Sequence, residues 1–128
     1  MRKTQAVLIN PLGVIATFSL GASAGLAAGD SAAGQQFFAT HCGACHATEP
    51  GVNKIGPSLA GVVGRKSGSA PGFNYSPALK EANITWDEKT LDQYLQNPTG
   101  DVHGSRMFLT VPSAADRQNA VAYLETLK

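Results

Sequence analysis

Cysteine is scarce in this chain of 128 residues. The two cysteines, Cys42 and Cys45, stand three positions apart. A disulfide between them would close a loop of four residues, and so short a loop constrains little of the unfolded chain. A structural disulfide is therefore a poor explanation of the pair. The histidine that follows directly, His46, indicates a different chemistry.

The first 28 residues have the pattern of a secretory signal peptide. Arg2 and Lys3 make a positive start, a mostly apolar stretch follows, and Ala22-Ser23-Ala24 fits a cleavage site. We therefore expect a signal peptide at residues 1–28 and one exported domain at residues 29–128, in the periplasm of a bacterium. The alternative is an uncleaved membrane anchor, because residues 12–29 carry no charge and approach spanning length.

Excess positive charge is lacking in the predicted domain. Without Arg2 and Lys3, 8 of the 10 basic residues remain against 9 acidic ones, which gives a formal net charge of −1. A nucleic-acid interface requires clustered positive charge, so we expect no nucleic-acid partner. A domain of about 100 residues has only a small core. A bound prosthetic group would help to fill it.

Alternation typical of a half-buried strand is also missing. Helical patterns occur instead at residues 31–40, 86–96 and 114–127, with glycine- and proline-rich loops between them. These patterns predict an all-α domain whose long loops need something to pack on. The local signals are caps at Asp30 or Ser31 and at Ser113, a capping box from Thr85 to Glu88, a stop at Pro98 and a short helical turn starting at Ser76-Pro77.

The run Cys42-Gly43-Ala44-Cys45-His46 is the attachment signature of a c-type haem. Each cysteine can add across one haem vinyl group. The two thioether bonds then hold His46 beneath the iron as its fifth ligand.

Two other chemistries compete for the same run. A redox dithiol would call for a βαβ context, whereas this chain is helical. Zinc needs four ligands, and Cys42, Cys45, His46 and His103 would supply them. His46 directly follows Cys45, however, so the sequence lacks the two separate ligand pairs of a typical zinc site. Haem is therefore the favoured cofactor.

A second axial ligand is available in one loop. Apart from the initiator, the only methionine is Met107, in the stretch "HGSRMFLTV" between the second and third predicted helices. A lone methionine often fills a core, but its loop position and the CxxCH run favour iron ligation. A thioether is a soft ligand that stabilises ferrous iron and raises the reduction potential. His103 is the competing ligand and would give a lower potential.

The order of these motifs resembles a class I cytochrome c, of the mitochondrial cytochrome c and bacterial cytochrome c2 type. The likeness runs from about Asp30 to Leu127. It implies the small single-domain class I fold, one covalent haem c, and a soluble one-electron carrier that is not itself an enzyme. The segments that carry it are "CGACH", "GPSLAG" at 56–61, "GRKSG" at 64–68, "APGFNYS" at 70–76, "NITWDEKTLDQYLQNP" at 83–98, "GSRM" at 104–107 and "AVAYLETL" at 120–127.

The resemblance also implies individual roles. Cys42 and Cys45 would carry the haem, and His46 and Met107 would ligate its iron. The remaining expected contacts are the Pro57 carbonyl accepting from His46, Arg65, Tyr75, Trp86 and Ser105 around the haem propionates, Tyr94 beside the Met107 sulfur, and Gly34 and Phe38 packed on Tyr123 and Leu124.

Several positions depart from the mitochondrial pattern, so the potential and the partners cannot be carried over. The residues that differ lie around the haem or on the docking face of the mitochondrial proteins, and they are Leu79, Leu109, His103, Thr99 and Gly100. Two positive residues, Lys54 and Arg106, remain near the expected haem edge.

We expect a monomer that docks transiently on redox protein complexes, including membrane complexes. With a net charge of −1, its association should depend only shallowly on ionic strength. The alternative function is a peroxidase or gas-binding sensor in which Met107 is a labile ligand.

Overall fold

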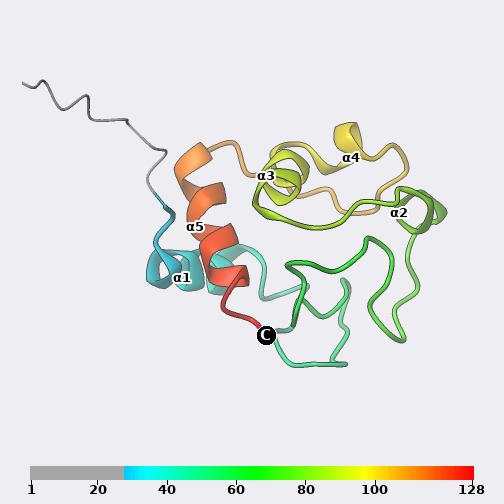
Figure 1. Ribbon diagram of the computed structural model, residues 1–128, viewed down its shortest axis with the longest axis horizontal. Coiled ribbons are helices and arrows are strands. Elements are labelled where there is room, and N and C mark those ends of the chain that lie inside the picture. Colours follow the sequence, from blue (N-terminus) through cyan, green and yellow to red (C-terminus); the bar gives the residue numbers. More distant parts are fainter. Residues whose placement is uncertain (1–27) are drawn as a thin grey trace, which may run out of the picture.

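The computed structural model describes residues 28–128, in which five helices alternate with long loops (Figure 1). The predicted signal peptide at residues 1–28 lies outside the described residues except for Ala28. The described part forms no strand, only one isolated antiparallel bridge between Lys66 and Thr85. Within residues 28–128, no helix has the length and apolar character that crossing a membrane requires. The prediction of an all-α fold is confirmed.

The helices are α1 (Ser31–His41), α2 (Pro77–Glu81), α3 (Glu88–Gln96), α4 (Pro98–Asp101) and α5 (Ala114–Leu124). Side-chain caps start most of them as expected. Asp30 accepts from the Ala32 and Ala33 N–H groups at the start of α1, Ser76 caps α2, and Ser113 accepts from the Asp116 N–H at the start of α5. Each cap satisfies a backbone donor that the helix itself leaves free.

The start of α3 and the end of α5 differ from the prediction. Helix α3 begins after Asp87, and its capping box pairs Asp87 with Thr90 instead of Thr85 with Glu88. Trp86 stays outside the helix because its backbone exchanges hydrogen bonds with Arg65 and Gly64. Helix α5 ends at Leu124 instead of residue 127. The last residues turn more tightly there, with the Leu127 N–H bonded to the Leu124 carbonyl.

Pro98 does end α3, but it also begins α4, which the sequence patterns do not predict. The Asn97 side chain accepts from the Gly100 N–H and caps this short helix. Proline suits the first position of a helix, where its missing N–H costs nothing.

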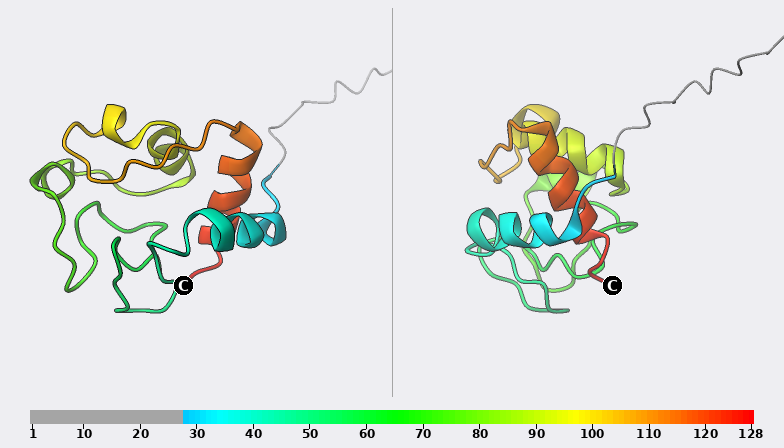
Figure 2. Two further views of the ribbon diagram at one scale, coloured as in Figure 1. Left: turned by 180° about the vertical axis from the view of Figure 1, so that it is seen from behind. Right: turned by 90° about the vertical axis from the view of Figure 1, so that its left-hand side faces the viewer.

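Helices α1 and α5 cross on one side of the molecule, and α3 packs against α5 (Figures 1 and 2). Gly34 makes the crossing possible. A Cβ at this position would lie 2.6 Å from the Asn119 carbonyl carbon and 2.9 Å from the Tyr123 Cβ. Phe38 packs beside it, with its ring centroid 5.5 Å from that of Tyr123.

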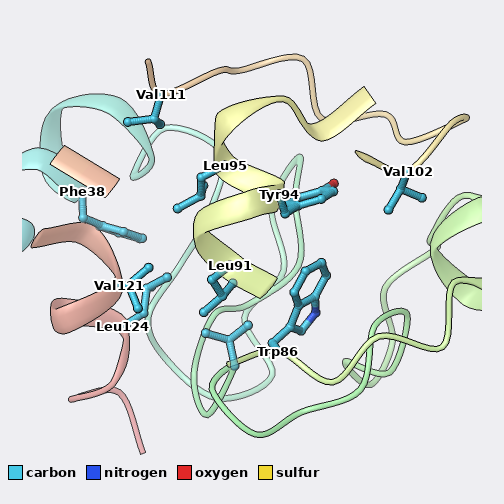
Figure 3. Close-up of a cluster of buried hydrophobic side chains, with 10 residues drawn as sticks. Phe38, Trp86, Leu91, Tyr94, Leu95, Val102, Val111, Val121 and Leu124 are labelled. Atoms are coloured by element: carbon cyan, nitrogen blue, oxygen red, sulfur yellow. The ribbon is translucent and has the colours of Figure 1, made fainter. Parts of the chain in front are cut away.

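The main apolar cluster joins this crossing to α3 (Figure 3). Leu91 and Leu95 of α3 face Val121 and Leu124 of α5, and Trp86 lies below α3 on the side of Tyr94. The long loop between α1 and α2 passes around the remaining side. Near its middle, this loop is tied to the C-terminal segment by a hydrogen bond from the Gly61 N–H to the Leu127 carbonyl.

Candidate haem site

One cavity of about 630 Å³ opens between the helices and the long loops. Its walls come from α1, the cysteine segment, the loops around residues 55–65 and 73–76, α3, the segment 106–109 and α5. Every predicted site residue lines it except Ser105. Most of the wall is apolar, and a volume of this size is typical of small-molecule and cofactor sites.

The cysteine pair follows α1 directly. Helix α1 ends at His41, and the Cys45 and His46 N–H groups then bond to the Cys42 carbonyl, so the segment forms a tight turn. This turn places both thiols and the His46 ring on the cavity wall. Cys42 and Cys45 are not joined by a disulfide.

His46 has its orientation fixed by two neighbours. Its Nδ1 lies 2.7 Å from the Pro57 carbonyl oxygen, which can only accept, so Nδ1 carries the proton. The ring also rests on Gly56, where a Cβ would come within 2.7 Å of Nδ1 and 2.8 Å of Nε2. With Nδ1 engaged, Nε2 is left with its lone pair available as a ligand.

Burial is the main influence on the pKa values of the Cys42 thiol and the His46 imidazole. It raises the pKa of the Cys42 thiol to about 11, with a smaller contribution from the neighbouring Cys45. Burial also lowers the pKa of His46, the Pro57 hydrogen bond opposes this, and the positive charges of Arg65 and Lys54 add to the lowering. A neutral imidazole is the form that binds a metal.

Met107 reaches the cavity from the loop after α4. Its N–H lies 3.3 Å from the Ser105 hydroxyl oxygen. That hydroxyl in turn shares a hydrogen bond of 2.6 Å with the Tyr94 hydroxyl of α3. Tyr94 lines the cavity while Ser105 lies behind it. Burial raises the pKa of Tyr94, and the Ser105 hydrogen bond partly offsets this.

Arg65, Tyr75 and Trp86 form a polar-tipped part of the wall. The Arg65 Nη1 and Nη2 groups donate to the Ala60 and Ser58 carbonyls at 3.0 Å each. Its Nε is buried and has no hydrogen-bond partner within the described residues. The Tyr75 hydroxyl accepts from the Ala70 N–H at 3.0 Å and keeps its own proton to donate.

An unpaired buried guanidinium nitrogen beside an apolar cavity calls for an acceptor, because a buried donor without one is costly. A carboxylate at the edge of a bound group would satisfy it. The cavity, the cysteine pair and this free donor therefore fit a haem with its carboxylates.

Some cavity residues have no signal in the sequence that marks them as part of a site. Ser76 is buried and lines the cavity while it caps α2. The cap was recognisable in the sequence, but its place in the wall was not. His41 also lines the cavity, and its ring stacks on Phe37 with centroids 4.2 Å apart.

The alternative ligand His103 is an exposed residue that does not line the cavity. Across residues 28–128, no three histidine, cysteine, aspartate or glutamate side chains gather into a possible metal site. The zinc alternative thus has no ligand set in the described part of the chain.

Residues 31–128 match the family model of cytochrome c. The chain belongs to the cytochrome c family. Cytochrome c2 of Rhodoblastus acidophilus is 48% identical over 103 residues, which cover 79% of this chain and 95% of the relative. Cytochrome c2 of Rhodomicrobium vannielii is 42% identical over 124 residues, which cover 95% of this chain and 96% of the relative.

The solved structure of cytochrome cH from Methylobacterium extorquens is also similar. It is 42% identical, with a TM-score of 0.71 over 77% of this chain and 99% of the other. The predictions of a class I cytochrome c fold, one covalent haem c and a one-electron carrier are confirmed. The peroxidase or gas-sensor alternative finds no support among these relatives.

Proposed function

We propose that this cytochrome c carries electrons between periplasmic and membrane redox complexes, with His46 and Met107 as the axial ligands of its haem iron. The observation that carries the proposal is the apolar-walled cavity of about 630 Å³, which gathers the CxxCH turn, Met107 and the free Arg65 Nε. When bound, haem c supplies an iron that takes up and releases one electron.

The residues around the cavity divide the work of holding such a group. Cys42 and Cys45 tether it by thioether bonds, which makes its loss negligible. The Pro57 carbonyl holds the Nδ1 proton of His46, which fixes the tautomer and would leave Nε2 as the nitrogen that binds the iron. The soft Met107 sulfur favours the ferrous state, which raises the potential.

We propose that Arg65, Tyr75 and Trp86 bind the haem propionates, as the sequence predicted. Arg65 contributes a positive charge. Its buried Nε also has a proton that no other group accepts within the described residues. Ser105 contributes indirectly, because its hydroxyl bonds Tyr94 and the Met107 backbone in this structure. We therefore assign Ser105 to holding the Met107 loop instead of a propionate.

If His46 and Met107 both bind the iron, no coordination position would remain open for a substrate. We infer from this that the protein is not an enzyme in itself.

An apolar rim at the cavity mouth is the proposed docking surface for redox partners. It consists of Ile55 and Phe108, each 80% exposed, and Leu109, 38% exposed, all of which line the cavity. Exposed apolar groups of this kind, gathered at one opening, mark interaction sites. Lys54 and Arg106 are the nearby charges in the sequence.

Because the rim is mainly apolar, the electron-transfer rate with a partner complex should change only shallowly with ionic strength. Phe108→Ser should slow the second-order rate. Val52→Ser is the matched control, since Val52 is 45% exposed but does not line the cavity. A steep salt dependence, or equal slowing by both variants, would contradict this surface.

Localisation and processing belong to the proposal as well. We propose that residues 1–28 are removed on export and that the remaining chain acts as a monomer in the periplasm. The match to the Rhodomicrobium vannielii protein covers 95% of this chain and so reaches into these residues. N-terminal sequencing of the exported protein tests the cleavage, and an intact N-terminus in a membrane fraction would favour the anchor.

The ligand assignment is tested by the optical spectrum of the exported protein. We expect sharp reduced haem c bands and the weak long-wavelength ferric band of a sulfur–iron bond. Met107→Ala should abolish that band, lower the potential and let carbon monoxide bind the reduced protein. His103→Ala is the control and should change none of these. A native protein that lacks the sulfur band, or that binds carbon monoxide rapidly, would overturn the assignment.

A further inference from the structure

The segment that carries Met107 is held at two points and is exposed between them. Its first anchor is Ser105, which is buried and bonded to Tyr94 of α3. Its second anchor is Val111, which is 3% exposed. Phe108 is 80% exposed between the two anchors, so its packing does little to hold Met107 in place.

The second anchor depends on two helices. The Val111 N–H donates to the Leu95 carbonyl of α3 at 2.8 Å. The Val111 and Pro112 carbonyls each accept from Nη1 of Arg117, on α5, at 2.9 Å. Figure 1 shows this segment, in orange between α4 and α5, running alongside α3.

Arg117 also binds α3 directly. Its Nε donates to the Asp92 carboxylate at 2.7 Å, the one ion pair found within residues 28–128. The Arg117 side chain is 8% exposed and that of Asp92 is 41% exposed. The Arg117 guanidinium therefore joins α5, α3 and the loop that follows Met107 in the sequence.

A buried arginine is an expensive way to fill space, because its charge must be desolvated. Packing alone would be served by an aliphatic side chain of similar volume. The fork of donors on a guanidinium offers what an aliphatic chain cannot, namely several directed bonds from one rigid plane. Both Nη1 bonds go to carbonyls of the Met107 loop.

We propose that Arg117 is a positioning residue for Met107, and that with Asp92 it keeps the Met107 sulfur in the haem cavity. The inference rests on the proposed function, since it takes Met107 as an iron ligand. Arg117 itself does not line the cavity and acts through the loop carbonyls at Val111 and Pro112.

The test is the rate at which saturating imidazole replaces the native ligand in the ferric protein, because release of Met107 limits that exchange. Arg117→Gln removes the ion pair and the forked donor. It should speed the exchange about tenfold or more, the usual effect of losing a charged hydrogen bond. Asp92→Asn keeps an acceptor oxygen for Nε and should give a smaller increase.

Asn119→Ala is the matched control on the same helix. Its side-chain oxygen accepts from the Asp30 N–H at 2.8 Å, so its loss weakens the contact with α1 and not the loop. It should lower the free energy of unfolding while the imidazole rate stays at the native value.

The outcomes separate this proposal from the ligand assignment. If the native protein shows no sulfur–iron band, both are wrong. If the band is present but Arg117→Gln leaves the rate unchanged, or Asn119→Ala raises it equally, only the role of Arg117 is wrong. If Arg117→Gln does not fold, Asp92→Asn decides alone, and an unchanged rate in that variant overturns the proposal.

Discussion

Replacing Gly34 with alanine tests the contact on which the fold closes. The added Cβ would lie 2.6 Å from the Asn119 carbonyl carbon, and closer still to its oxygen. Contacts between carbon atoms are favourable at about 3.5–4.0 Å, so α1 and α5 would have to separate by about 1 Å. The obstacle is backbone, which cannot swing aside as a long side chain can.

The expected loss follows from two opposing effects. Alanine favours a helix over glycine by about 1 kcal/mol. Overpacking of a core costs about 1–3 kcal/mol, and here the separation also loosens the contacts of Phe38, Val121 and Leu124, all buried. We expect the free energy of unfolding to fall by about 2 kcal/mol, or about 10 °C in melting temperature.

Guanidinium unfolding followed by far-ultraviolet circular dichroism measures this loss. Gly43→Ala is the control, because a Cβ there would have its nearest neighbour, the Ala39 carbonyl oxygen, at an ordinary 3.4 Å. Gly43→Ala should be close to neutral. Equal midpoints for Gly34→Ala and the native protein, or an equal loss in the control, would refute the close-approach argument.

Three further results are expected. Arg65→Gln removes a positive charge beside the proposed propionate edge, so redox titration should show a potential lower by tens of millivolts, whereas Lys66→Gln, at an exposed neighbour, should show a smaller change. Hydrogen bonds from the Thr90 N–H and hydroxyl hold the pKa of Asp87 below its usual 3.8. The contribution of Asp87 to the free energy of unfolding is therefore complete above pH 3.8 and is lost as the pH falls through the folded-state pKa. In acid unfolding curves, Asp87→Ala should lose less stability than the native protein over this pH range. Identical acid dependence in the two proteins would contradict the prediction. Gly56→Ala pushes a Cβ into the His46 ring. We expect a shifted reduction potential and a changed nuclear magnetic resonance spectrum for the residues around the haem. A native-like spectrum would contradict the role of Gly56 in seating the ring.

Local signals in the sequence were sufficient where the structure uses local bonds. The Ser113 cap of α5 needs only the Asp116 N–H three residues away, so the start of that helix was predictable. The start of α3 was not predictable, because backbone hydrogen bonds to the distant Arg65 and Gly64 hold Trp86 outside the helix. The capping-box pattern from Thr85 to Glu88 is local, so it carries no information about these hydrogen bonds to a distant segment.

The same distinction applies to the site. The CxxCH run is contiguous and so could be read directly. The family resemblance added residues that line the cavity in the structure, namely Pro57, Arg65, Tyr75, Trp86, Tyr94 and Met107. Ser105 was assigned to the propionates, but in the structure its hydroxyl meets Tyr94 and the Met107 N–H. Arg117 gave no signal, because its partners Asp92 and Val111 come from other segments and a charged residue on a helix usually faces solvent.

The crossing of the first and last helices also determines when the core can form during the life of the chain. Helix α1 packs on α5, and Gly61 bonds to Leu127, so the N-terminal third of the domain lacks its partner until the last residues are present. Contacts between such distant segments require a long loop to close, and this entropic cost slows folding. The cysteine pair, which follows α1, therefore belongs to an open chain before closure. A chain that stays open until its last residues are present leaves both thiols accessible for the thioether bonds to haem.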